Sequence, residues 1–203
     1  MIIYCDGGLY FPPKNTARKD RTVTVTYGVL FHCGYDEPIE TSGKYELSLK
    51  YQSIYEHIAF LESFKLLKDN NIDYKKVSFF TDSEDIGYAQ TYLHKDNYAT
   101  TRCEKFLNEL GMALHVLSME HYKEEVIDCL LNSTFHKIKS HTKNFTVDNM
   151  RVDYLSKLAF NEKKPLSYQN FLECSFFKYK TVDSVVSFNL PFMPKEPGTS
   201  IKI

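Results

Sequence analysis

Four acidic residues stand where the surrounding sequence predicts buried structure. Asp6 follows the apolar stretch MIIYC, and Asp82 follows VSFFT, so each comes at the end of a predicted core strand. Glu56 lies on the same helical stripe as apolar residues further along its helix, and Asp153 lies one turn after Asn149. Each acid alone has an ordinary explanation as a turn, capping or surface residue. Together they indicate one shared site.

A cluster of carboxylates is costly, because the charges repel one another and raise one another's pKa unless cations neutralise them. Mg²⁺, or Mn²⁺ as a substitute, is the natural neutraliser, since both ions prefer oxygen ligands. Two such ions about 4 Å apart can activate a water and stabilise the leaving oxygen in phosphodiester cleavage. Two other acids compete for these roles: Glu62, about 9 Å further along the helix of Glu56, and Asp148.

The elements that would position these acids are predicted in a definite order. Three strands with turn-like joins come first and predict an antiparallel meander. A helix follows, for which Ser53 and Glu56 have capping-box spacing. A fourth strand, helices interrupted near Gly111, a fifth strand and a last helix complete the order, which predicts a mixed sheet flanked by helices. The predicted ranges are 1–6, 22–34 and 39–49 for the first strands, 53–71 for the helix, then 75–83, 98–132, 134–142 and 147–164.

The segments YCDGG, YEHIAFLES, FFTDSEDIG and IKSHTKNFTVDNMRVDYLSKLA occur in the order of the ribonuclease H motifs. Over roughly residues 1–160 the chain therefore resembles the ribonuclease H family, in its ribonuclease HI-like branch. The last segment is the most specific, with a histidine ending a strand before Asn-x-x-x-Asp. The resemblance implies an α/β ribonuclease H-like fold with a mixed five-stranded sheet over residues 1–162. Residues 163–203 would form a C-terminal extension that packs on this domain or docks a protein partner.

The resemblance also implies roles for individual residues. Asp6 would bridge two metal ions, with Asp153 on the ion that activates the attacking water. Glu56 and Asp82 would hold the ion on the leaving-group side, and His141 would assist proton transfer or product release. The Asn149-to-Asp153 spacing favours Asp153 over Asp148, and position in the motif favours Glu56 over Glu62.

The implied substrate is an RNA–DNA hybrid whose RNA strand is cleaved to leave 5′-phosphate ends. The 2′-hydroxyl and the groove width distinguish such a hybrid from either pure duplex. Glycine backbone can approach an RNA strand closely, and polar side chains near the catalytic glutamate can hydrogen-bond to nucleic acid. The residues expected to contact nucleic acid are Gly7, Gly8, Gln52, Ser53, Lys143 and Asn149.

Two other classes of protein stay open. One is another nuclease or a strand-transfer enzyme of the resolvase or transposase type on the same fold. The histidine and the Asn-x-x-x-Asp motif favour the ribonuclease H pattern over it. The other is a nucleic-acid-binding module without chemistry, against which the presence of all four carboxylates counts. The chain departs from the family at Tyr51, which replaces a small hydroxyl residue, and it lacks the Trp- and Lys-rich protrusion of some bacterial members.

Composition sets the remaining expectations. The 203 residues carry a net charge of -1, so nucleic acid would be held by local basic clusters and not by global attraction. The five cysteines fit neither a disulfide framework nor a zinc pattern. No apolar run is long enough to span a membrane, and no secretory leader is evident. We therefore expect a monomeric, intracellular protein of the cytoplasm, with association to a nucleoid or nucleus allowed.

Overall fold

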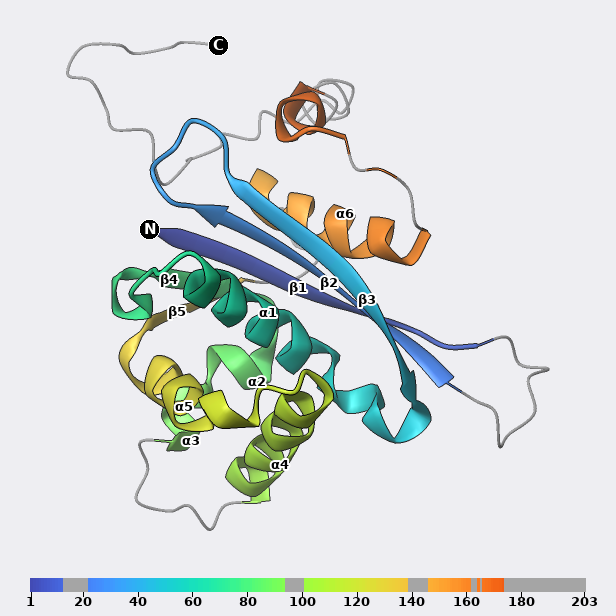
Figure 1. The fold of residues 1–203 in the computed structure, drawn as a ribbon, viewed down its shortest axis with the longest axis vertical. Helices are drawn as coiled ribbons and strands as arrows, with labels where there is room; N and C mark the ends of the chain where they lie inside the picture. Colours follow the sequence, from blue (N-terminus) through green and yellow to red (C-terminus); the bar gives the residue numbers. More distant parts are fainter. Residues whose placement is uncertain (13–21, 94–100, 139–145, 162–163, 165, 174–203) are drawn as a thin grey trace.

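The computed structural model describes residues 1–12, 22–93, 101–138, 146–161, 164 and 166–173. This part of the chain forms one five-stranded sheet with helices on both faces (Figure 1). The strands are β1 (Ile2–Tyr10), β2 (Thr22–His32), β3 (Ile39–Ser48), β4 (Ser78–Thr81) and β5 (Thr134–Lys137). The α-helices are α1 (Tyr55–Asp69), α2 (Glu84–Gly87), α3 (Ala89–Leu93), α4 (Thr101–Val116), α5 (Lys123–Asn132) and α6 (Val147–Asn161). The 3-10 helices are η2 (Leu49–Ile54), η3 (Tyr74–Lys76) and η4 (Glu120–Tyr122).

The strands lie in the order β3-β2-β1-β4-β5. β1 pairs antiparallel with β2, and β2 pairs antiparallel with β3, as predicted for a meander of three consecutive strands. β4 pairs parallel with β1 on its other side, and β5 pairs parallel with β4. The predicted fold class, a mixed sheet of three antiparallel strands followed by parallel ones, is confirmed.

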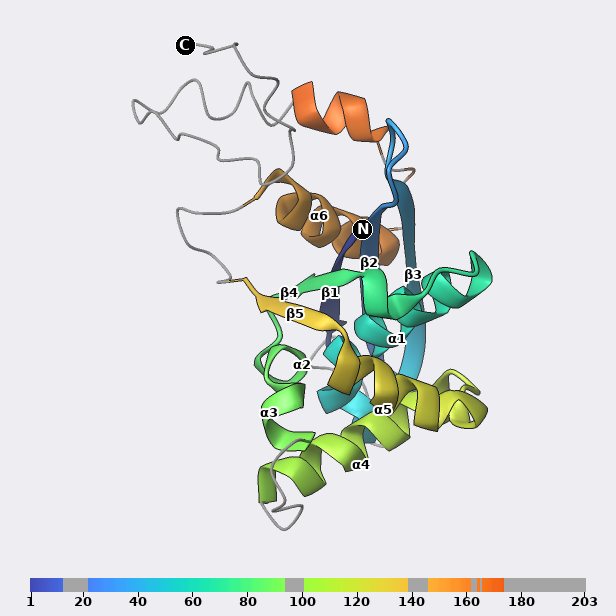
Figure 2. The ribbon, with the colours of Figure 1, turned by 90° about the vertical axis from the view of Figure 1, so that its left-hand side faces the viewer.

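The sheet separates two layers of apolar contacts. Alternate residues of β1 point to opposite faces, so that Ile3 and Cys5 join the large core under α1, whereas Ile2 and Tyr4 join the smaller core under α6. Figure 2 shows α6 on one face of the sheet and α1 on the other. In the described part of the chain, no helix is both long enough and apolar enough to cross a membrane.

The first strand does not end at Asp6, as the sequence had indicated. β1 continues to Tyr10, and its pairing with β2 runs through Gly7 and Gly8 without a break in register. Glycines often mark strand ends, but here β2 supplies a partner for the whole length of β1. Asp6 is therefore a residue in the middle of a strand.

Two helix predictions also need correction. Ser53 does not cap α1, because residues 49–54 already form the 3-10 helix η2 and the N-cap residue Ile54 makes no side-chain bond. The helix α4 passes through Gly111 without a break and ends at Val116. The chain turns instead at Ser118, which has a positive φ of 54°.

Candidate active site

The site begins where the parallel strands of the sheet diverge. The pairing of β1 with β4 ends at Cys5 and Thr81, and the next residue of each segment is an aspartate, Asp6 or Asp82. Carboxyl ends of neighbouring parallel strands are where α/β sheets commonly place ligands. Both carboxylates therefore lie beside a stretch of β1 that β4 no longer covers.

Glu56 reaches the same place from the first turn of α1. The start of this helix lies close against β1, because a Cβ atom added at Gly7 would meet the backbone oxygen of Tyr55 at 2.7 Å. The backbone N–H of Gly7 also donates a hydrogen bond to the Glu56 carboxylate. Gly7 thus has a structural role at the site, in addition to the contact with RNA predicted from the sequence.

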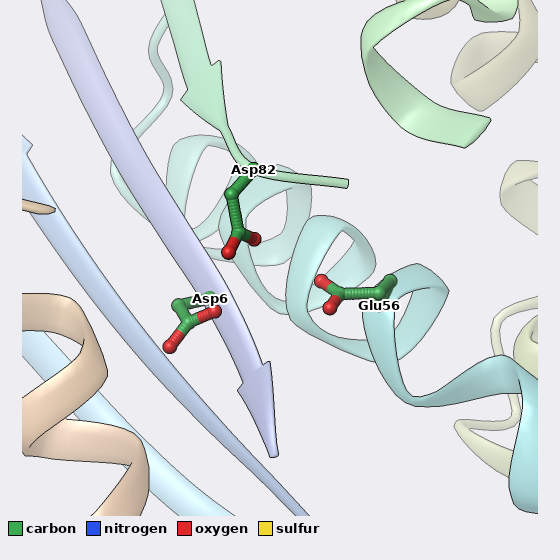
Figure 3. A group of neighbouring side chains, drawn as sticks. All are labelled: Asp6, Glu56 and Asp82. Atoms are coloured by element: carbon green, nitrogen blue, oxygen red, sulfur yellow. The ribbon is translucent and has the colours of Figure 1, made fainter. Parts of the chain in front are cut away.

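The three carboxylates converge. One oxygen each from Asp6, Glu56 and Asp82 lie within 4.8 Å of one another, and all three side chains are partly buried. Figure 3 shows them pointing toward a common space between β1, the end of β4 and α1. Glu56 Oε2 is buried and has no hydrogen-bond partner among the described residues. A buried carboxylate oxygen without a donor is available to coordinate a cation.

Burial and mutual repulsion both act on the protons of this cluster. Burial raises the pKa of Asp6 to about 8, helped by the charges of Asp82 and Asp153. Burial also raises the pKa of Glu56 well above its usual value, with Asp6 and Asp82 adding to it. The folded chain therefore holds these acids at a cost that a bound cation would relieve.

The donor set fits a hard divalent cation. It consists of carboxylate oxygens alone, at separations that one ion can bridge, and it includes an oxygen with no other partner. Mg²⁺ and Mn²⁺ favour such ligands, whereas zinc sites in proteins usually include histidine or cysteine. Asp6, Glu56 and Asp82 are the residues that would hold the ion.

Asp153 lies near this group but outside it. α6 approaches the sheet most closely at Gly28, the β2 partner of Asp6, where an added Cβ atom would meet the backbone oxygen of Val152 at 2.3 Å. This packing brings Asp153 close enough to raise the pKa of Asp6. The Asp153 carboxylate is bonded to Lys157 Nζ at 2.6 Å. The role of Asp153 in holding the ion that activates the attacking water stays a prediction.

The two competing acids are engaged elsewhere. Glu62 is buried and accepts a hydrogen bond from the hydroxyl of Tyr45 on β3. Asp148 lies 3.3 Å from His32 Nε2 and accepts a hydrogen bond of 2.6 Å from the Tyr168 hydroxyl. Neither belongs to the three-carboxylate group.

The residues predicted to bind nucleic acid have varied surroundings. Gln52 and Ser53 are exposed on η2, just before Glu56, and so are accessible. Asn149 is buried on α6, and an added Cβ at Gly8 would meet the Thr26 hydroxyl at 2.3 Å. Two further predicted residues, His141 and Lys143, lie outside the described residues. For all of these, contact with nucleic acid stays a prediction.

Sequence reasoning missed three neighbours of the cluster. Ser156 is buried and its hydroxyl lies 3.5 Å from Asp6 Oδ2. The charge of Asp85 raises the pKa of Glu56 further, and burial, with Glu56 and Asp82, raises the pKa of Tyr55 to about 12. The signal for Ser156 was its position three residues after Asp153 on α6, which is about one helical turn.

Comparison with known proteins gives one kind of match. No family model and no curated protein matches the chain. A solved structure of LC11-RNase H1, isolated from compost by a metagenomic approach, is 22% identical, with 79% of this chain and 95% of that one covered and a TM-score of 0.45. The same protein in complex with an RNA/DNA hybrid matches at 17% identity, 79% and 96% coverage and a TM-score of 0.42.

The N-terminal RNase H domain of rv2228c from Mycobacterium tuberculosis, as a fusion with maltose-binding protein, is 8% identical. That match covers 78% of this chain and 98% of the other, at a TM-score of 0.42. The strand order, the pairing directions and the acids at the diverging strands define a ribonuclease H-like fold with a carboxylate cluster at its centre.

Proposed function

We propose that this chain is a metal-dependent endonuclease that hydrolyses the RNA strand of RNA–DNA hybrids by a two-metal-ion mechanism. The observation that carries the proposal is the convergence of Asp6, Glu56 and Asp82 at the edge of β1 left open by β4. Structural cores rarely gather three carboxylates without cationic partners, because the acids then raise one another's pKa. Perturbed acids grouped in this way are typical of catalytic sites.

The residues of the chain have separate tasks in this proposal. Asp6 would be the acid common to both metal positions, Glu56 and Asp82 would hold the ion at the leaving-group side, and Asp153 would hold the ion at the attacking side. Bound Mg²⁺, or Mn²⁺ in its place, supplies an activated water and charge stabilisation for the leaving oxygen. The hydroxyl of Ser156 lies near Asp6 Oδ2 and helps to orient that carboxylate.

The choice of a hybrid follows from the sequence motifs and from what is exposed beside the site. Gln52 and Ser53 lie on the surface immediately before Glu56, where their polar groups are available to the substrate. A protein without a large positive charge can recognise a hybrid by the sugar hydroxyls and backbone of its strands, without contacts to the base edges. With a net charge of -1, we expect weak binding of a few phosphates by local basic residues and little non-specific binding to other nucleic acids.

A panel of substrates tests the proposal. Labelled RNA–DNA hybrid, RNA duplex, DNA duplex and single strands are incubated with the wild type, Glu56→Gln and Glu62→Gln in Mg²⁺ and in Mn²⁺. We expect the wild type and Glu62→Gln to cut only the RNA of the hybrid. Glu56→Gln should lose at least about 100-fold in rate, since even outer-shell changes at metal sites cost 10–100-fold.

The other outcomes decide against the proposal in distinct ways. Cleavage of DNA but not of the hybrid indicates a different nuclease on the same fold. Binding without cleavage of any substrate indicates a binding module. Equal loss of activity in Glu56→Gln and Glu62→Gln indicates that the glutamates support the fold and not the chemistry.

A further inference from the structure

A pair of stacked aromatic rings lies at the far end of the elements that carry the acids. Tyr10 of β1 and Phe160 of α6 stack face to face, with ring centroids 3.9 Å apart and an interplanar angle of 9°. Phe160 is 40% exposed, so the pair is not a core contact. An exposed aromatic ring gains little from water, and its face is a surface for another planar or apolar group.

Two independent elements set the distance from this pair to the cluster. Asp6 and Tyr10 lie on the same face of β1, four residues and about 13 Å apart. Asp153 and Phe160 lie on the same side of α6, seven residues and about 10 Å apart. The strand and the helix meet at both ends of this length, because Asp153 acts on the pKa of Asp6 at one end and Tyr10 stacks on Phe160 at the other. The acids and the rings are therefore two ends of one surface.

The ring of Tyr10 lies back toward the acids. Its edge is 3.2 Å from where a Cβ atom of Gly8 would be, so the missing side chain of Gly8 leaves room for it. Burial raises the pKa of Tyr10, the charge of Lys157 opposes this shift, and the charges of Asp153 and Asp6 add to it.

A cation stands between the rings and the acids. Lys157 lies one turn after Asp153 and one turn before Phe160, its side chain is 59% exposed, and its Nζ contacts the Asp153 carboxylate. The ring of Phe160, the charge of Lys157 and the carboxylates follow one another along this surface. A strand of nucleic acid offers complementary groups in the same arrangement, because it carries bases and sugars that stack on rings and phosphates that bind cations.

Resting on the function proposed above, we infer that Tyr10 and Phe160 form a stacking platform for a nucleotide of the cleaved strand. That nucleotide is about three or four positions from the scissile phosphate, because the rings lie roughly 10–13 Å from the acids and phosphates of one strand recur about every 3.4 Å along the helix axis. The outer face of Phe160 receives its base or sugar, and Lys157 faces the phosphate between the platform and the site. Such contacts tolerate any sequence, since every nucleotide offers a flat face.

Substrate length tests the platform more sharply than activity alone. The substrate is a hybrid duplex whose cleaved strand contains ribonucleotides at one position only, so that cleavage can occur only there. The cleaved strand is then shortened one nucleotide at a time from either end. The KM of the wild type, Phe160→Ala and Tyr10→Ala is measured on each substrate. Tyr35→Ala is the matched control, since Tyr35 is 77% exposed in the turn between β2 and β3.

On the full-length hybrid, Phe160→Ala should raise KM at least about fivefold, the lower limit for loss of one stacked base. Tyr10→Ala removes the ring on which Phe160 stacks and should raise KM as well, whereas Tyr35→Ala should stay close to the wild type. On one side of the site, the KM of the wild type should rise to that of Phe160→Ala once the cleaved strand no longer reaches the platform. Shortening the uncleaved DNA strand should leave the difference intact.

Three results would overturn the platform. The first is a rise in KM for Phe160→Ala that is the same at every length of the cleaved strand. The second is a rise in KM that disappears only when the DNA strand is shortened. The third is an equal rise in KM for Tyr35→Ala. Each of these presupposes a wild type that cleaves hybrids. A wild type that cleaves nothing in the substrate panel instead rejects the proposed function itself, so the two failures are separate.

Discussion

Replacing Asp6 by asparagine is expected to abolish hybrid cleavage and, without metal at pH 8, to stabilise the folded protein. The rate should fall at least about 100-fold, because the residue proposed to be common to both metal positions loses its charge. The stability should rise because the substitution removes a buried charge that Asp82 and Asp153 repel. Activity and stability then move in opposite directions, as they do where a site is strained for function.

The pKa of Asp6 determines how the stability of the metal-free protein changes with pH. The pKa of Asp6 is 3.8 in an ordinary setting and about 8 in the folded protein. Between these values the folded chain binds more protons than the unfolded chain, so its free energy of unfolding falls as pH rises. The stability that protonated Asp6 contributes is complete below pH 3.8 and is lost as pH rises through about 8.

Thermal unfolding of metal-free wild type, Asp6→Asn and Glu62→Gln between pH 5 and pH 9 measures this effect. The wild type should lose stability as pH rises, at about 2–4 °C in Tm for each kcal/mol. Asp6→Asn should show a weaker dependence and a higher Tm at pH 8, and Glu62→Gln should retain the slope of the wild type. A lower Tm for Asp6→Asn than for the wild type across the whole pH range would contradict this prediction, because it would show that the Asp6 carboxylate stabilises the folded protein.

Replacing Arg151 by alanine is expected to give the largest loss of stability among these variants. Its side chain is fully buried, and Nε and Nη2 donate to the two carboxylate oxygens of Glu40 at 2.7 Å each. Nη2 also donates to the backbone oxygen of Leu166 at 2.5 Å, and the guanidinium carbon lies 4.9 Å from the ring centroid of Phe171. Arg151 therefore joins α6 to β3 and to the described part of the predicted C-terminal extension.

The expected cost is about 3 kcal/mol, at the lower end for broken buried ion pairs because Glu40 keeps some contact with water. Tm should then fall by about 6–12 °C. The double variant Arg151→Met with Glu40→Leu should recover much of this loss, since it leaves no uncompensated charge. A Tm for Arg151→Ala within about 2 °C of the wild type would show that the pair contributes little.

Much of the fold and most of the site could be predicted from the sequence, because their signals lie within short stretches of the chain. An apolar run followed at once by Asp82 is visible without knowledge of the fold, and so is Glu56 on an inward stripe. Gly7 and Gly8 misled because their effect depends on neighbours: β2 pairs with both, and Tyr55 and Thr26 occupy the space that their side chains would fill.

The relations that could not be predicted join distant residues. Arg151 and Glu40 are 111 positions apart, and nothing in either local sequence indicates the other. Ser156 and Asp6 are 150 positions apart, and they meet because α6 crosses β2 at Gly28. Long-range packing of this kind depends on the assembled sheet. The roles of His141, Lys143 and the extension 163–203 in catalysis or docking stay predictions, as do the monomeric state and the intracellular location.

Metal binding by the protein alone is the most direct test of the central claim that Asp6, Glu56 and Asp82 form a divalent cation site. Mn²⁺ is titrated into wild type, Asp6→Asn and Glu62→Gln, free Mn²⁺ is measured by electron paramagnetic resonance, and Mg²⁺ is then added as competitor. We predict saturable binding to the wild type and Glu62→Gln that Mg²⁺ displaces, and a loss of at least about tenfold in affinity for Asp6→Asn. Equal affinity in all three proteins, or no binding by the folded wild type, would contradict the account.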